Sequence, residues 1–128
     1  MNLMTKSLQK RFAEIGSQEK SADKIVVAKY FLPGHSATWY ATEYDPIQEI
    51  FLGYVVGLQE DEWGYFSLEE LQSVRSPHLN LPIEQDLYCG EKRLSEHLPE
   101  LVGEMKRWQE IIEIETRREQ ERDEDLER

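Results

Sequence analysis

Hydrophobic and polar residues follow each other along the chain in patterns that predict a helix at each end and strands between them. Near the N-terminus, Leu8, Phe12 and Ile15 recur at the spacing of one helix face. Thr5 precedes this pattern as an N-cap residue, and Gly16 follows it as a glycine that can end a helix in the left-handed conformation. The pattern therefore predicts a helix that begins after Thr5 and ends before Gly16.

The middle of the chain contains segments with the composition of strands. Residues 24–32 and 49–58 are apolar on both faces, which is typical of strands inside a sheet. Glycine, proline and acidic residues separate the segments and predict short turns, so neighbouring strands should be antiparallel. The predicted strands are residues 24–32, 38–42, 49–58, 63–66 and 86–89.

Two further helices are predicted after the fourth strand. Ser67 and Glu70 match a capping box, so a short helix should begin after Ser67. The last helix should begin between Ser95 and Pro99, because proline is tolerated in a first turn. Its apolar residues form one seam, which should dock on the sheet or on a second copy of the chain. This seam contains Leu101, Met105, Trp108 and Ile112.

These elements predict an α+β fold, in which a mostly antiparallel sheet of about five strands is packed on one face by the N-terminal and C-terminal helices. Residues 1–108 should form a single domain. Residues 109–128 are mostly charged and should form a helical extension of that domain. If the apolar seam docks on a second copy instead, the chain should be a homodimer through its C-terminal helix.

Charge and composition limit the classes of function. The 128 residues include 26 acids and 15 Lys or Arg, which gives a net charge of −11. This excess of acid argues against a broad phosphate-binding surface, and therefore against direct nucleic-acid binding. No apolar run approaches the roughly 20 residues that cross a bilayer, and the N-terminus lacks an apolar signal core. The sequence thus predicts a cytoplasmic protein with no membrane contact.

Few residues suggest catalysis or metal binding. Cys89 is the single cysteine, and no histidine stands in a recognisable partner position for it. The three histidines fit no metal motif. His97, Glu100 and Glu104 could share a helix face, but a solvated first helical turn accounts for the same residues. We therefore predict no catalytic residue, no metal site and no cofactor.

Aromatic residues on the predicted strands suggest a binding surface. Alternation along a strand places Trp39 and Tyr40 on opposite faces, so both cannot lie in a one-sided core. Tyr40 is expected to be exposed, because Trp39 shares its face with Ala41 and a tryptophan more readily fills a core. The predicted partner-binding surface has aromatic anchors and an acidic rim. Its residues are Trp39, Tyr40, Tyr65 and Tyr88, with Glu43 and Asp86 at the rim.

Four stretches of the sequence together resemble a known family. They are residues 23–29, 38–43, 64–71 and 81–88. Over about residues 5–96 the chain resembles the bacterial domain-of-unknown-function family 2958 (DUF2958). That family is met mainly on plasmids, integrative elements and phages, so the resemblance implies a mobile-element protein and carries no established activity. Gln85 departs from the arginine that the resemblance implies at this position.

Together these observations predict a non-enzymatic accessory protein of a mobile element that acts through protein–protein contacts. One alternative is an acidic DNA mimic that inhibits a nucleic-acid-binding host protein, because a chain this acidic could display carboxylates at the spacing of DNA phosphates. The other alternative is a small metal-dependent hydrolase or nuclease, because acidic residues gather around several turns.

Overall fold

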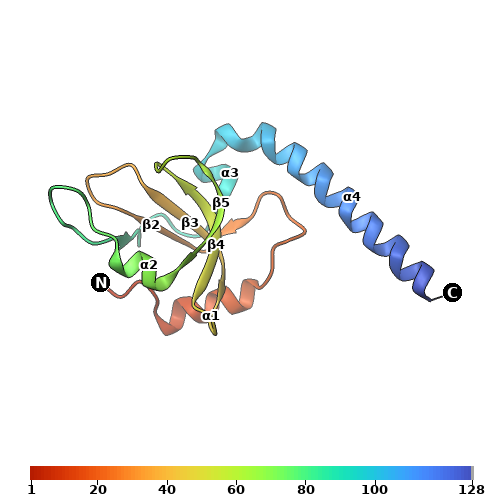
Figure 1. The fold of residues 1–128 in the computed structure, drawn as a ribbon, viewed down its shortest axis with the longest axis horizontal. Coiled ribbons are helices and arrows are strands. Elements are labelled where there is room, and N and C mark those ends of the chain that lie inside the picture. Colours follow the sequence, from red (N-terminus) through yellow and green to blue (C-terminus); the bar gives the residue numbers. More distant parts are fainter. Residues whose placement is uncertain (128) are drawn as a thin grey trace.

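The computed structural model describes residues 1–127, which form a main sheet, a smaller sheet and flanking helices (Figure 1). The main sheet is antiparallel and has the spatial order β5–β4–β3–β2–β6. A second, two-stranded sheet pairs β1 with β7. The predicted α+β fold with a sheet of about five strands is confirmed. The strands are β1 (Ile25–Val26), β2 (Ala28–Phe31), β3 (Thr38–Asp45), β4 (Ile50–Val56), β5 (Glu62–Ser67), β6 (Glu84–Gln85) and β7 (Lys92–Arg93).

The first two helices begin where their capping residues predict. The Thr5 side chain accepts a hydrogen bond from the Leu8 N–H at 3.1 Å, and Gly16 ends the same helix with a φ of +66°. The Ser67 hydroxyl accepts from the Glu70 N–H at 3.0 Å. Both predicted helix starts are confirmed. The helices are α1 (Lys6–Ile15), α2 (Leu68–Ser73), α3 (Leu94–His97), the 3₁₀ helix η1 (Pro99–Leu101) and α4 (Val102–Leu126).

Helices cover both faces of the main sheet. The first face packs against α1 and α2, which contribute Phe12, Leu68 and Leu71 to its core. The second face packs against η1 and α4, which contribute Leu101 and Met105. The expectation that the N-terminal and C-terminal helices pack on the same face is therefore wrong. The central strands carry apolar residues on both sides, so each side needs a cover that keeps it from water.

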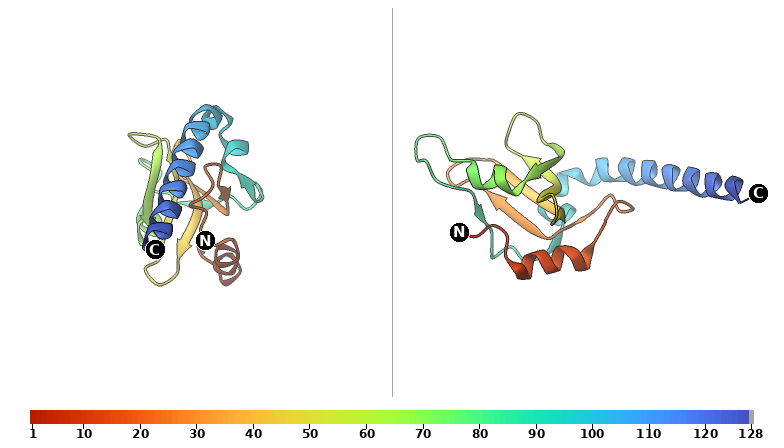
Figure 2. Two further views of the ribbon diagram at one scale, coloured as in Figure 1. Left: turned by 90° about the vertical axis from the view of Figure 1, so that its right-hand side faces the viewer. Right: turned by 60° about the horizontal axis from the view of Figure 1, so that its bottom comes forward.

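Helix α4 begins on the sheet and ends away from it. Met105 is buried, and Trp108 and Ile112 pack against the same cluster, so the predicted apolar seam docks on the sheet. Farther along, α4 projects from the domain (Figures 1 and 2), and the Lys20 ammonium lies 3.1 Å from the Glu119 carboxylate. The predicted domain boundary between residues 108 and 109 falls inside this continuous helix.

The end of the predicted extension is only partly covered by the structure, because Arg128 lies outside the described residues. Within residues 1–127, no helix combines the length and the apolar character needed to cross a membrane.

Of the predicted strands, one is divided in the structure and one is absent. The predicted strand 24–32 is divided at Val27, because β1 pairs with β7 whereas β2 pairs with β3 and β6. The predicted strand 86–89 is wrong. There the Asp86 carboxylate accepts hydrogen bonds from the N–H groups of Tyr88 and Cys89, at 2.9 and 3.1 Å, and closes a turn.

A β-bulge in β3 decides which face its last residues occupy. Thr42 is an extra residue in the register against β4. As a result Tyr44 lies on the first face, where its ring centroid is 4.7 Å from that of Phe51. Glu43 instead lies directly opposite Leu52 on the second face. Uninterrupted alternation would have exchanged the faces of Glu43 and Tyr44.

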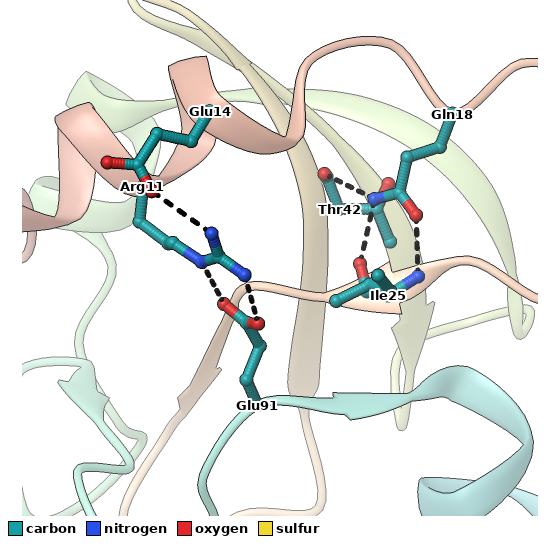
Figure 3. A network of polar contacts seen from close by, with 6 residues as sticks. All are labelled: Arg11, Glu14, Gln18, Ile25, Thr42 and Glu91. Carbon is teal, nitrogen blue, oxygen red and sulfur yellow. Dashed lines mark hydrogen bonds and ion pairs between the residues drawn. The ribbon is translucent and has the colours of Figure 1, made fainter.

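Polar contacts hold the loop after α1 against this bulge, and α1 against the segment before β7 (Figure 3). The Gln18 side-chain amide donates to the carbonyls of Ile25 and Thr42, at 2.9 and 3.0 Å, and its oxygen accepts from the Ile25 N–H at 2.6 Å. The Arg11 guanidinium donates to both carboxylate oxygens of Glu91 at 2.8 Å. The Thr42 carbonyl therefore keeps a hydrogen-bond partner although the bulge removes it from the regular ladder.

Candidate protein-binding surface

The six residues of the predicted partner-binding surface do not lie together. Trp39 and Tyr40 are 6% and 7% exposed, in the cores of opposite sheet faces. The expectation that Tyr40 is exposed is therefore wrong. Its ring is covered by α3, where the His97 ring centroid lies 5.2 Å away. Neither aromatic residue is available as a surface anchor.

Asp86 and Tyr88 lie just beyond β6, at the sheet edge opposite β5. Tyr88 is almost fully exposed. Asp86 forms an ion pair with Lys29, whose Nζ lies 3.6 Å from the carboxylate. The hydrogen bond from the Tyr88 N–H is the main cause of a lowered pKa for Asp86. These contacts show Asp86 stabilising its own turn, and the strand order separates it from Glu43, the other acid of the predicted rim.

The residues considered for catalysis or metal binding do not form a site. Burial and the nearby Asp86 carboxylate raise the pKa of the Cys89 thiol, whereas a reactive cysteine needs a lowered one. No three His, Cys, Asp or Glu side chains within residues 1–127 are placed to hold one metal ion.

The structure does bring two predicted residues, Glu43 and Tyr65, into one row. Glu43 lies opposite Leu52 across β3 and β4, and Leu52 lies opposite Tyr65 across β4 and β5. Directly opposed residues share a sheet face, so the three side chains are neighbours on the second face. They line an open hollow of about 510 Å³ between α1 and the end of the β3–β4 hairpin. Tyr65 is 78% exposed, so it is accessible to a partner.

A second hollow continues this row towards α4. It has a volume of about 270 Å³, and its walls include Leu52, Trp63, Trp108 and Ile112. The rings of Trp63 and Trp108 meet edge to face, with centroids 6.2 Å apart. Leu52 lines both hollows, so one apolar surface runs from Tyr65 to Ile112. We call the surface of Leu52, Trp63, Tyr65, Trp108 and Ile112 the second-face groove.

Charges at the rim of the groove are mainly negative. Glu43 and Asp45 line its β3–β4 end, and neither forms an ion pair within residues 1–127. At the α4 end, the Lys24 ammonium lies 5.7 Å from the Trp63 ring centroid, a cation–π contact. Burial lowers the pKa of Lys24, while the carboxylates of Glu43 and Glu19 act in the opposite direction.

Sequence reasoning missed Leu52, Trp63, Trp108 and Ile112 as surface residues. The apolar seam placed Trp108 and Ile112 in the core, and both do contact it, but each remains partly exposed because α4 leaves the sheet at this point. Helical spacing identifies the face that is apolar and does not show how far the sheet extends beneath it. No sequence signal marked the residue at which α4 extends beyond the sheet.

Comparison with known proteins identifies a family. The model of the family described as "Protein of unknown function (DUF2958)" matches residues 3–103. No curated protein and no solved structure matches the chain. The matched range contains both sheets, α1, α2 and the start of α4, and it ends before Trp108 and Ile112.

Proposed function

Because the chain belongs to the family described as "Protein of unknown function (DUF2958)", whose description states no activity, we propose a function from the surface of the molecule. We propose that it is a non-enzymatic binding module that acts through contacts with another protein. The observation that carries this proposal is the second-face groove, an accessible aromatic and apolar surface with an acidic rim. Such surfaces are typical of protein interaction sites.

The residues of the groove suit a protein partner better than other ligands. Trp63, Tyr65 and Trp108 offer large contact areas at a low cost in side-chain entropy. The acids Glu43 and Asp45 would repel the phosphates of a nucleic acid. Leu101 and Met105, the buried part of the apolar seam, are packed within the chain and cannot join two copies, whereas Trp108 and Ile112 remain partly exposed in the groove. A cytoplasmic setting also belongs to this proposal and rests on the sequence, and a place on a plasmid, integrative element or phage rests on the family resemblance.

Two exposed tyrosines provide a matched test. Tyr65 lies in the groove and Tyr88 lies at the opposite edge of the sheet. Neither is buried, so Tyr65→Ser and Tyr88→Ser should both leave the fold intact. An interface hot spot contributes about 2 kcal/mol or more, so Tyr65→Ser should weaken partner binding by roughly thirtyfold, and Tyr88→Ser should not change it.

The measurement is quantitative affinity capture from the native host with wild type and both variants, read by mass spectrometry. A partner that depends on Tyr65 and not on Tyr88 would support the proposal. Equal recovery of every captured protein by the three forms would reject the groove as the working surface.

A further inference from the structure

Strand β5 has one free edge, because β4 is its single neighbour in the main sheet. The Leu68 N–H, just after β5, donates to the Glu49 carbonyl at 2.9 Å, and this pair continues the β4–β5 register. Hydrogen-bonded pairs alternate along an antiparallel ladder. The main-chain groups of Gly64 and Phe66 therefore point towards β4. By the same alternation, those of Trp63 and Tyr65 point outward.

The outward edge is open to another strand. Within residues 1–127, no turn, cap or loop hydrogen bond involves the main-chain groups of Trp63 or Tyr65. Natural proteins protect exposed edges with proline, lysine or a bulge. Residues 62–67 contain neither proline nor lysine, and their pairing with β4 shows no register shift. This edge therefore has the geometry for strand addition, in which an extended peptide continues the sheet.

The two sides of this edge differ in chemistry. On the first face, an open hollow of about 720 Å³ reaches β5 at Gly64, where a Cβ atom would meet nothing within 4 Å. Glu60, Glu62 and Glu70 line this hollow, and its lining contains no Lys or Arg. On the second face lies the apolar groove, with Trp63 and Tyr65 on β5 itself. Successive side chains of an added strand would alternate between the acidic hollow and the apolar groove.

From this arrangement we propose that β5 binds an extended basic segment of the partner protein as an added antiparallel strand. The Lys or Arg side chains of that segment face Glu60, Glu62 and Glu70, which form no ion pair within residues 1–127. Its apolar side chains lie on Trp63 and Tyr65. The inference rests on the proposed function and specifies the partner as a segment in which basic and apolar residues alternate.

A second copy of this chain fits the edge less well than a basic segment. Each copy carries a net charge of −11, and pairing two β5 edges would bring two sets of carboxylates together. Like charges across an interface oppose association. The occupant is therefore a basic segment of another protein.

The first experiment uses a capped octapeptide in which Lys and Val alternate, added to the full-length ¹⁵N-labelled protein. Amide hydrogen exchange of the outward N–H groups of Trp63 and Tyr65 should slow by at least about tenfold at saturation. The N–H groups of Gly64 and Phe66 should already be protected in the free protein. A matched octapeptide of alternating Glu and Val should protect neither residue.

Three results would overturn the proposal. The first is no protection by the Lys–Val peptide, and the second is equal protection by the Glu–Val peptide. The third is protection of Trp63 and Tyr65 in the free protein that increases with protein concentration, which would identify a second copy as the occupant.

Methylation of the peptide tests the strand geometry with the protein unchanged. In antiparallel pairing, residues opposite Trp63 and Tyr65 share their face and form the hydrogen-bonded pairs. These are the valines of the Lys–Val peptide. N-methylation of every Val should therefore abolish protection, whereas N-methylation of every Lys should leave it. If both methylated peptides bind alike, strand addition is wrong.

A variant pair separates this inference from the proposed function. Tyr65→Pro removes the outward N–H and spares the β4 ladder, because proline is tolerated on the solvent side of an edge strand. Tyr65→Thr removes the same ring and keeps the N–H. The proline variant should lose peptide protection at Trp63, and the threonine variant should retain it. Equal protection in both would refute strand addition and leave the groove proposal standing. Unchanged partner capture by Tyr65→Ser would refute the groove proposal alone.

Discussion

Gly53 provides a direct test of the packing that shapes the second-face groove. It lies on β4 directly opposite Gly64 on β5. A Cβ atom on Gly53 would lie 2.3 Å from the carbonyl oxygen of Tyr40 and 3.1 Å from the Cα of Ala41, whereas one on Gly64 meets nothing within 4 Å. The obstructing atoms belong to the main chain of β3, beside the bulge at Thr42, so they cannot move without displacing the strand.

The two glycines should therefore respond in opposite ways to alanine. Overpacking lowers the free energy of unfolding by about 1–3 kcal/mol and sometimes more. Because the clash at Gly53 is with the main chain, Gly53→Ala should cost about 3 kcal/mol. Alanine at Gly64 should stabilise by about 0.5–1 kcal/mol, because glycine loses more conformational freedom on folding. The free energies of unfolding of the two variants should differ by roughly 3–4 kcal/mol.

The assay is urea unfolding followed by the fluorescence of the three tryptophans. Gly53→Ala should lower the midpoint at an unchanged slope, and the amide resonances of Thr42 and Glu43 should shift because the bulge is strained. A Gly53→Ala variant as stable as wild type would refute the close approach of β3 and β4. Equal destabilisation by Gly64→Ala would refute the open space at the β5 edge.

Three further predictions concern capping, packing and pH. Ser67→Ala should lower the unfolding free energy by about 0.5–2 kcal/mol through loss of the N-cap of α2, and an unchanged thermal midpoint would contradict this role. Met105→Ala should lower the free energy of unfolding in urea by about 2–5 kcal/mol, because Met105 is buried. Val102→Ala, at an exposed position of the same helix, should have little effect. Equal effects of the two substitutions would contradict docking of α4 on the sheet. Burial, together with nearby lysines, lowers the pKa of His97. Protonation of His97 therefore favours the unfolded chain. The free energy of unfolding should be highest above about pH 6.5 and should fall as the pH decreases towards the pKa of His97 in the folded protein. His97→Gln should flatten this part of the stability profile, and a wild-type urea midpoint independent of pH between about 7.5 and 5.5 would refute the assignment.

The candidate surface shows which of the predicted surface residues the structure brings together and which it separates. Glu43 and Tyr65 were predicted as part of one surface, and the structure places them in one hollow. Trp39 and Tyr40 were predicted there too, but each is buried because helices cover both sheet faces. Alternation correctly placed these two side chains on opposite faces, and it carries no information about which face a distant helix covers.

The outcome of each prediction depended on the sequence distance between the interacting groups. Thr5 and Ser67 cap helices through N–H groups three residues away, so the sequence by itself determined those boundaries. The seam of the last helix was likewise determined by helical periodicity, because burial of one helix face requires it, and the inner strands were indicated by their continuous apolar composition.

The tertiary structure decided what depends on distant partners. The strand predicted across Val27 is divided because β7, more than 60 residues later, pairs with β1. The bulge at Thr42 accepts a hydrogen bond from Gln18, lies beside the close approach of Gly53 to β3, and turns Glu43 onto the second face. The second-face groove exists because α4 leaves Leu52 only partly covered. Each of these features depends on which distant segments pair with one another. The local pattern of apolar and polar residues cannot distinguish the alternative pairings, because each candidate segment has a similar pattern.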